Sequence, residues 1–227
     1  MIVLSVDTSG KQGSIALARA DSCINCDVIE TAALEGGTFS AQLVPQIASL
    51  LTKHGFSKSD IEAFVVVSGP GSFTGLRVGL AVVKALAEAL KKPIAAVSLL
   101  ETIAIAAGWK GRVIAALDAG RDEAYVGQYE VEGDTGAGMA IMIGEELLTQ
   151  AELFARVGGL QFVTTDSKLS EAAARAGVSA MLIGGRNAGS VAALGWRKII
   201  RGEIILPEDL EANYIRRTDA ELLAKCR

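Results

Sequence analysis

The order of predicted strands and helices repeats once along this chain, and the repetition limits its possible folds more than any other feature. In each half, three strands are followed by a helix, a strand and a second helix, as judged from the spacing of apolar residues. Strands are predicted in the first half at residues 2–6, 14–19, 28–34, 63–68 and 93–97, with helices at 40–53, 75–90 and 99–107. Strands are predicted in the second half at residues 112–118, 123–131, 139–143, 161–165 and 180–183, with helices at 151–156, 169–176 and 187–201. The sequence therefore predicts an α/β protein with a duplicated βββαβα unit.

The first strand of each half ends in an aspartate, Asp7 in one and Asp118 in the other. Such a duplication is typical of two ribonuclease-H-like lobes, the architecture of the actin, sugar-kinase and Hsp70 superfamily. The stretch 107–111 separates the halves, so we place the first lobe at residues 1–108 and the second at 109–227. On topology alone, two generic α/β layers with an accidental similarity are the alternative.

The composition favours a globular protein and argues against an independent RNA-binding surface. Half of the 227 residues are hydrophobic, which is enough for a packed core. No apolar run approaches the ~20 residues that a membrane-spanning helix needs, and residues 1–7 read as a strand instead of a signal peptide, so we expect a cytoplasmic protein. The net charge is −4 and aromatic residues make up 5% of the chain, whereas a protein that binds RNA by itself usually presents a basic face. Another subunit would have to hold most of any RNA.

The histidine and cysteine residues predict no metal site. His54 is the one histidine, and it follows a predicted helix, where it would interact with the negative end of the helix dipole. Cys23 and Cys26 form a C-x-x-C pair between two predicted strands, while the redox form of that motif lies at the start of a helix. A zinc site would need two further ligands. We therefore expect no stoichiometric zinc or iron.

The turn after the first strand is a candidate phosphate-binding loop. In the superfamily named above, backbone N–H groups of such a turn surround phosphates while an aspartate orients a hydrated cation. Asp118, followed by Ala-Gly-Arg, is the counterpart in the second half. The alternative is an ordinary hairpin turn, because Asp-x-Ser-Gly turns join many strands. The possible nucleotide site, which we interpret as vestigial, comprises Asp7, Thr8, Ser9, Gly10 and Asp118.

A glycine-rich segment follows the predicted strand at 63–68 and opens the helix at 75–90. Its glycines permit close backbone approach, and its hydroxyl residues can cap the helix. It is not a Walker A loop, because it has no Gly-Lys-Ser or Gly-Lys-Thr sequence. A tight strand-to-helix turn is the alternative. The segment begins with Gly69, Pro70, Gly71, Ser72, Phe73 and Thr74 and continues through Gly75 to Gly79.

This segment, G-P-G-S-F-T-G-L-R-V-G, resembles the signature of the TsaB (YeaZ) family. The resemblance extends to residues 4–9, 97–102, 118–125 and 213–216, and it is looser from 126 to 205. It implies a non-catalytic partner of the TsaD transferase subunit, which modifies the adenosine next to the anticodon of tRNA. It also implies a TsaE ATPase partner, contact with tRNA only through the complex, and no tightly bound cofactor, with ATP or ADP bound weakly or only in the complex.

The chain departs from the family pattern at Phe39, where relatives tend to carry histidine. Any role of that histidine is therefore lost here. The TsaD-like catalysts hold a metal with a histidine pair spaced H-x-x-x-H, and this sequence has no such pair. The resemblance thus implies a subunit that is not an enzyme by itself.

The helix at 75–90 is the predicted partner interface. It carries two apolar stripes, one more than a surface helix needs to pack on its own sheet. The second stripe, with two glycines, would admit a partner helix or, in the isolated protein, the same helix of a second copy. Burial by the second lobe is the alternative. The predicted interface residues are Gly75, Arg77, Gly79, Val82 and Leu86, and we expect Gly79→Leu or Val82→Arg to spare the fold and weaken partner binding.

Two enzymatic functions are alternatives. An ATP-dependent phosphotransferase of the sugar-kinase type would use Asp7, Asp118 and the Gly184-Gly185 loop, although the sequence offers no convincing general base. That loop is also explained as a strand-to-helix turn capped by Asn187. A metallo-glycopeptidase, the other alternative, would require metal ligands that the sequence does not provide.

Overall fold

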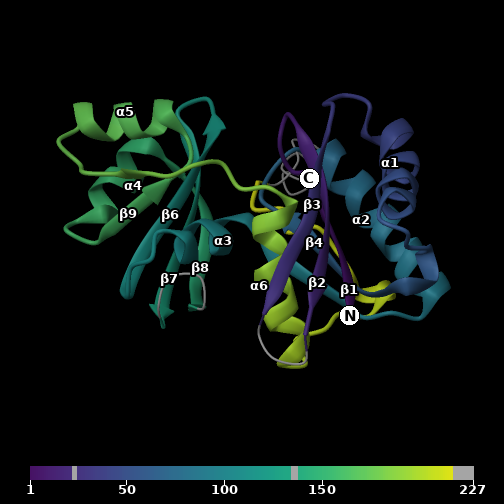
Figure 1. The fold of residues 1–227 in the computed structure, drawn as a ribbon. Coiled ribbons are helices and arrows are strands. Elements are labelled where there is room, and N and C mark those ends of the chain that lie inside the picture. Colours follow the sequence, from purple (N-terminus) through teal and green to yellow (C-terminus); the bar gives the residue numbers. More distant parts are fainter. Residues whose placement is uncertain (22–24, 134–137, 217–227) are drawn as a thin grey trace, which may run out of the picture. The chain divides into compact units, whose positions relative to one another are not determined.

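Two five-stranded mixed sheets form the protein in the computed structural model, which describes residues 1–21, 25–133 and 138–216 (Figure 1). The first sheet has the order β3-β2-β1-β4-β5 and is made of β1 (Ile2–Asp7), β2 (Gly13–Ala20), β3 (Cys26–Leu34), β4 (Ile61–Gly69) and β5 (Ile94–Ser98). The second has the order β10-β9-β6-β7-β8 and is made of β6 (Gly111–Gly120), β7 (Glu123–Glu132), β8 (Met139–Thr149), β9 (Gln161–Thr164) and β10 (Met181–Leu182). In each sheet the first strand is antiparallel to the second and parallel to the fourth. The predicted duplication is confirmed.

Helices cover both faces of the first sheet. α1 (Phe39–Lys53) and α2 (Phe73–Leu90) lie on one face, and α6 (Ala188–Ile200) crosses the other (Figure 1). The interior strand β4 is accordingly apolar on both faces, as expected for a parallel strand between helical layers. Two short 3₁₀ helices lie at Lys58–Asp60 and Pro207–Asp209, and Ile205 forms a β-bridge with Ile94 at the edge of β5.

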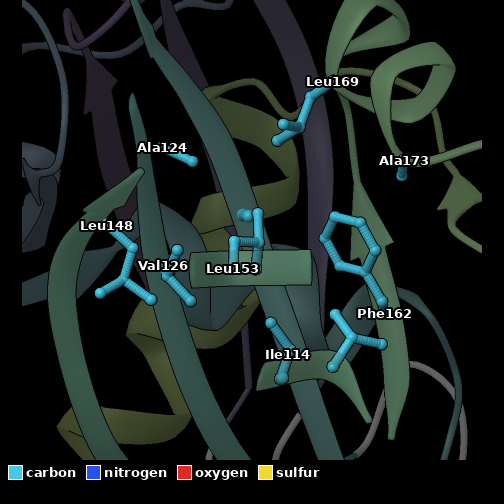
Figure 2. Close-up of a cluster of buried hydrophobic side chains, with 10 residues drawn as sticks. Ile114, Ala124, Val126, Leu148, Leu153, Phe162, Leu169 and Ala173 are labelled. Atoms are coloured by element: carbon cyan, nitrogen blue, oxygen red, sulfur yellow. The ribbon is translucent and has the colours of Figure 1, made fainter. Parts of the chain in front are cut away.

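The second sheet packs one face against α4 (Gln150–Val157) and α5 (Ser167–Arg175). Alternate residues of β6, β7 and β8 point into this core, as a period of two requires. Figure 2 shows the cluster, whose buried members are Ile114, Ala116, Ala124, Val126, Leu148, Leu153, Val157, Phe162, Leu169 and Ala173. α3 (Leu99–Ala106) connects the two sheets along the chain.

The chain divides into two compact units that differ from the predicted lobes 1–108 and 109–227 in two segments, 103–108 and 186–212. The first unit contains Met1–Thr102 together with Arg186–Ala212, and the second contains Ile103–Gly185 and the residues from Asn213 onward. The returning segment belongs to the first unit because α6 contacts all five strands of the first sheet. The contact is close: a Cβ atom at Gly195 would lie 2.1 Å from the side chain of Val65.

Most predicted elements lie within a few residues of their observed positions, and β8 is the main exception. The strand was predicted at 139–143 but continues to Thr149, so it is 11 residues long and forms the edge of its sheet. Within residues 1–21, 25–133 and 138–216, no helix is long and apolar enough to cross a membrane.

Candidate functional site

The turn after β1 and the first turn of α2 form one hydrogen-bonded junction. The amide of Ser72 donates to the carbonyl oxygen of Ser9 at 2.7 Å, and the hydroxyl of Thr8 donates to the carbonyl oxygen of Gly75 at 2.8 Å. Ser72 is also the N-cap of α2, since its Oγ accepts from the amide of Gly75. The two motifs that the sequence analysis treated separately therefore meet at one site in the first unit.

Gly75 and Gly79 let α2 approach this turn closely. A Cβ atom at Gly75 would lie 2.1 Å from the carbonyl oxygen of Thr8, and one at Gly79 would lie 2.3 Å from the Thr8 hydroxyl. Only glycine leaves room for these contacts. Both glycines are buried. This corrects the expectation that the two glycines face a partner helix, because the turn of the same chain fills that space.

Asp7 is buried at the centre of the junction. Its side chain is only 6% exposed, and its Oδ1 accepts from the amide of Ser9 at 2.9 Å and from the Ser9 hydroxyl at 2.6 Å. Burial raises the pKa of Asp7 above its usual value, while the two hydrogen bonds from Ser9 act in the opposite direction. The Ser9 amide thus binds the carboxylate of its own turn. Gly10, at the tip of the turn, is exposed.

Phe39 lies beside the same turn. Its side chain is 7% exposed, and its ring atoms would be 2.9 Å from a Cβ atom at Gly13 and 3.4 Å from one at Gly75. A Cβ atom at Gly13 would also lie 3.0 Å from the carbonyl oxygen of Asp7. The ring of Phe39 therefore packs beside the backbone of Gly13 and Gly75.

We predict that Asp7→Asn raises the melting temperature at about pH 7 by on the order of 2–4 °C. The raised pKa means that the folded protein holds the Asp7 proton more tightly than the unfolded chain does. The wild-type free energy of unfolding therefore falls as the pH rises from about 4 through the folded-state pKa, and asparagine, which does not ionise, removes this fall. Melting curves at about pH 4 and pH 7 check it, with the exposed Asp118→Asn as control. A lower melting temperature than wild type at neutral pH would contradict the prediction.

Asp118, the counterpart of Asp7, has a different environment. It ends the regular pairing of β6 with β7, is exposed, and accepts a hydrogen bond from the amide of Gly120 at 3.0 Å. Asp118 belongs to the second unit and Asp7 to the first. The two acids thus share a position in the duplicated topology, but only Asp7 is buried.

The remaining motif residues shape the start of α2. Gly69 and Pro70 are joined by a cis peptide after β4, and Gly71 lies against the backbone of Ser9. The guanidinium of Arg77 stacks over the ring of Phe73, 3.8 Å from its centroid. Such a cation–π contact contributes about 0.5–1 kcal/mol, which offsets the unfavourable position of a cation near a helix N-terminus. A partner anion is not needed to explain Arg77. Thr74 is exposed, and Val82 and Leu86 are half-buried.

His54 takes part in a polar cluster that the sequence analysis did not identify. Its Nε2 lies 2.8 Å from Glu30 Oε2, and Lys53 Nζ lies 2.7 Å from the same oxygen. The hydrogen bonds from Lys53 and then His54 lower the pKa of Glu30. The cluster fixes the end of α1 to β3. Among the described residues, no three His, Cys, Asp or Glu side chains lie close enough together to hold a metal ion.

Cys26 lies at the start of β3 as a free thiol, while Cys23 falls outside the described residues. Burial raises the pKa of Cys26 to about 11, and the neighbouring charge of Asp27 acts in the same direction. The thiolate is the reactive form of cysteine. Cys26 is therefore a weak nucleophile at neutral pH.

We predict that iodoacetamide alkylates Cys26 roughly 100-fold more slowly than an ordinary cysteine at about pH 8. The pKa of its thiol is raised from an ordinary value of 9.0 to about 11, so its thiolate fraction is correspondingly smaller. The rate should rise tenfold for each unit of pH up to about 11. Peptide mass spectrometry after timed labelling resolves this residue from the other two cysteines, and cysteine in the denatured chain gives the reference rate. Labelling of native Cys26 at the denatured rate would contradict a raised pKa.

The glycine-rich loop before α6 ends in a helix cap. Asn187 accepts from the amide of Ser190 at 3.2 Å, and the amide of Ala188 donates to Ser14 Oγ at 2.9 Å. The second of these bonds attaches the start of α6 to β2. The strand-to-helix turn, which the sequence offered as the alternative to a phosphotransferase loop at Gly184-Gly185, accounts for Asn187.

The C-terminal Asn-Tyr-Ile-Arg run is bound to the second sheet. The side-chain amide Nδ2 of Asn213 donates to Glu145 on β8, and the guanidinium of Arg216 pairs with Glu123 on β7. Arg216 also lies 5.8 Å from the ring centroid of Tyr125. Glu123 is thus engaged in an ion pair. The Tyr-Ile-Arg ending was the signal in the sequence that could have indicated this contact.

Comparisons with known proteins agree with this arrangement. The family described as TsaD, tRNA N6-adenosine threonylcarbamoyltransferase, matches residues 36–192. The tRNA threonylcarbamoyladenosine biosynthesis protein TsaB of Bacillus subtilis is 37% identical over 131 residues, which are 57% of this chain and 56% of that protein. The protein of the same name from Escherichia coli is 35% identical over 133 residues, 57% of this chain and 55% of that protein. The chain therefore spans about half the length of these curated relatives.

A solved structure resembles the whole fold. YeaZ from Pseudomonas aeruginosa superimposes with a TM-score of 0.73 at 25% sequence identity. The superposition covers 94% of this chain and 100% of that chain. The two proteins thus share their fold over most of this chain.

Proposed function

Because this chain belongs to the TsaD family, tRNA N6-adenosine threonylcarbamoyltransferase, and resembles its TsaB (YeaZ) branch, we propose that it acts in the synthesis of threonylcarbamoyladenosine in tRNA. Its role is that of a partner subunit that binds and activates a TsaD-type transferase. A TsaE-type ATPase joins the complex, and tRNA is held through the other subunits. The similarity to proteins named for this biosynthesis carries the proposal.

The contacts of the candidate residues support a role without catalysis. The sole histidine of the sequence is engaged with Glu30, and Asp7 accepts its hydrogen bonds from within its own turn. Glu123 is paired with Arg216. Each of these side chains therefore has a structural function that explains its position.

A reconstitution tests the proposal. A TsaD-type subunit and a TsaE-type ATPase of the same organism are incubated with tRNA and the threonylcarbamoyl donor, with and without this chain, and the modified nucleoside is measured by mass spectrometry. We expect modification only when this chain is present and none when it replaces the TsaD-type subunit. Modification by this chain alone, or modification that does not change on its omission, would reject the role.

We propose that a partner surface on α2 consists of Val78 together with Val82 and Leu86, the two apolar side chains of the predicted interface. These residues are spaced by four and are half-buried, so they form one apolar stripe beside the buried glycines. Gly75 and Gly79 contribute by holding α2 in place against Thr8. Arg77, which is exposed over Phe73, borders the stripe.

We predict that the isolated protein binds ATP with a dissociation constant of ~0.1–1 mM, equivalent to roughly 4–5.5 kcal/mol. The Ser9 amide and the Thr8 hydroxyl already donate within the protein, so a phosphate group would have to displace those bonds. A buried acid that lowers stability is typical of a site that serves a ligand, and this supports weak binding instead of none.

Calorimetric titration with ATP measures this affinity. Asp7→Asn should weaken the binding further, whereas Asp60→Asn, far from the turn in sequence and engaged with Ser57, serves as the matched control. Low-micromolar affinity accompanied by turnover of ATP would instead favour the phosphotransferase of the sugar-kinase type.

A further inference from the structure

We infer that the tip of the hairpin between β6 and β7, formed by Arg121 and Asp122, is a charged contact surface for the TsaD-type subunit. The tip belongs to the second unit, whereas the surface proposed on α2 belongs to the first. The inference rests on the proposed function and adds an electrostatic contact to it.

The backbone of the tip has a left-handed conformation that arginine rarely adopts. The φ angles of Gly120, Arg121 and Asp122 are +72°, +57° and +58°. Gly120 pairs with Glu123, so Arg121 and Asp122 form the turn between them. Two-residue hairpin turns with positive φ at both positions favour Asn-Gly or Asp-Gly, because a longer side chain is strained there. The turn therefore disfavours Arg121.

Neighbouring contacts hold the tip in this conformation. The amide of Gly120 donates to Asp118 Oδ1 at 3.0 Å, and the amide of Gln150 donates to the carbonyl oxygen of Asp122 at 2.8 Å. Gln150 begins α4, whose N-cap is Thr149. A strained backbone persists only where its surroundings determine it, and a surface that is already ordered loses less conformational entropy on binding. The two side chains of the tip thus start from a fixed backbone.

The side chains of the tip are not used inside the part of the chain that the structure describes. Both are exposed, and neither forms an ion pair or a side-chain hydrogen bond with a residue in 1–21, 25–133 or 138–216. The next residue, Glu123, differs because it pairs with Arg216. Strained residues cluster at sites where function requires them. The strain at Arg121 therefore points to a contact outside the chain.

The charges of the tip favour a protein partner over RNA. Asp118 and Asp122 are exposed on either side of Arg121, so the tip carries both signs. The phosphate backbone of RNA is negative throughout and binds clustered cations. A protein surface offers acids and bases, which can complement both signs of the tip. In the proposed complex, the TsaD-type subunit is the protein that this chain binds and activates.

Arg121→Asn tests the inference in the full chain, because asparagine tolerates positive φ and removes the charge. The melting temperature should rise by about 1–4 °C. The dissociation constant for the TsaD-type subunit should rise about 3–10-fold at about 50 mM NaCl. At about 500 mM NaCl the wild type and the variant should bind alike, since salt screens exposed charges. Calorimetric titrations at both salt concentrations and melting curves measure these changes.

Two further variants separate the charge at the tip from other effects. Arg121→Lys keeps the charge and the strain, so it should melt and bind nearly as the wild type does. Arg175→Asn is the matched control, because Arg175 is exposed at the end of α5 in the same unit. It removes one positive charge away from the tip and should leave the affinity unchanged at both salt concentrations.

Three results would overturn the inference while leaving the proposed function intact. One is an Arg121→Asn variant that melts higher but binds the TsaD-type subunit as tightly as the wild type at low salt. Another is an equal loss of affinity in Arg175→Asn, which would trace the effect to net charge. The third is an Arg121→Asn variant that melts no higher than the wild type, which would remove the argument from strain. A wild type that does not bind the TsaD-type subunit would reject the proposed function, and the inference with it.

Discussion

Gly79→Leu should lower the free energy of unfolding by about 2–4 kcal/mol. The leucine Cβ would lie 2.3 Å from the Thr8 hydroxyl, so α2 must move away from the turn and the hydrogen bond from Thr8 to Gly75 must lengthen or break. Loss of this junction also removes the restraint on the buried Asp7. Denaturant titration measures the change, and a thermal melt should show a decrease of about 5–15 °C.

The matched control is Ala81→Leu, two residues further along the same helix at an exposed position. This substitution adds the same side chain at a position that does not contact Thr8. The free energy of unfolding should therefore change by about 0.5 kcal/mol or less. If both variants melt at the same temperature, the close approach of α2 to Thr8 does not stabilise the first unit. The expectation from sequence that Gly79→Leu spares the fold is corrected here by the position of Thr8.

Val82→Arg should weaken binding of a TsaD-type subunit by at least ~2 kcal/mol, about 30-fold, while the protein stays folded. Val82 is half-buried in the stripe of α2, and a long arginine can extend to solvent in the free protein. In the complex the same charge would be desolvated against an apolar surface, which is unfavourable. Calorimetric titration with the TsaD-type subunit, together with melting curves, separates binding from stability.

Val28→Arg is the control for this substitution. Val28 is 45% exposed on β3 and lies next to Gly189 of α6, on the other side of the sheet from α2. It should bind the partner as the wild type does. Arg77→Ala should weaken binding less than Val82→Arg, because Phe73 already holds the guanidinium. Equal losses in Val28→Arg and Val82→Arg would place the interface away from α2.

The order of strands and helices was predictable because the spacing of apolar residues is regular in both halves of the chain. The buried run of β4, with Phe64 and three valines after it, has no other explanation than a strand covered on both faces. The second half of β8 was not predicted. Glu145 and Glu146 interrupt its alternation, and the reasons they are tolerated, Asn213 and Arg156, are distant in sequence or belong to the next helix.

The candidate site was predictable as two motifs but not as one junction. Thr8 and Gly75 are 67 residues apart, and only the tertiary fold brings them into contact. From the sequence, two glycines on α2 were assigned to a partner interface, because glycine allows close approach by any backbone. In the structure, the turn after β1 runs toward α2, so the backbone that approaches these glycines belongs to the same chain.

The contact between Glu30 and His54 was likewise not predictable from the sequence. The Glu30–His54 pair joins residues whose spacing of 24 has no meaning in a sequence pattern. His54 could be interpreted from sequence only through the helix that it follows. The structure shows that a neighbouring strand supplies its partner.

The return of residues 186–212 to the first unit has a consequence for synthesis of the protein. A ribosome completes β1 to β5 early, yet the helix that covers their second face emerges only after the whole of residues 103–185. Until then Val65 lacks the helix that packs against it. The N-terminal half of the chain is thus among the last parts to become fully covered, and a nascent chain released before α6 would present an apolar sheet face to chaperones.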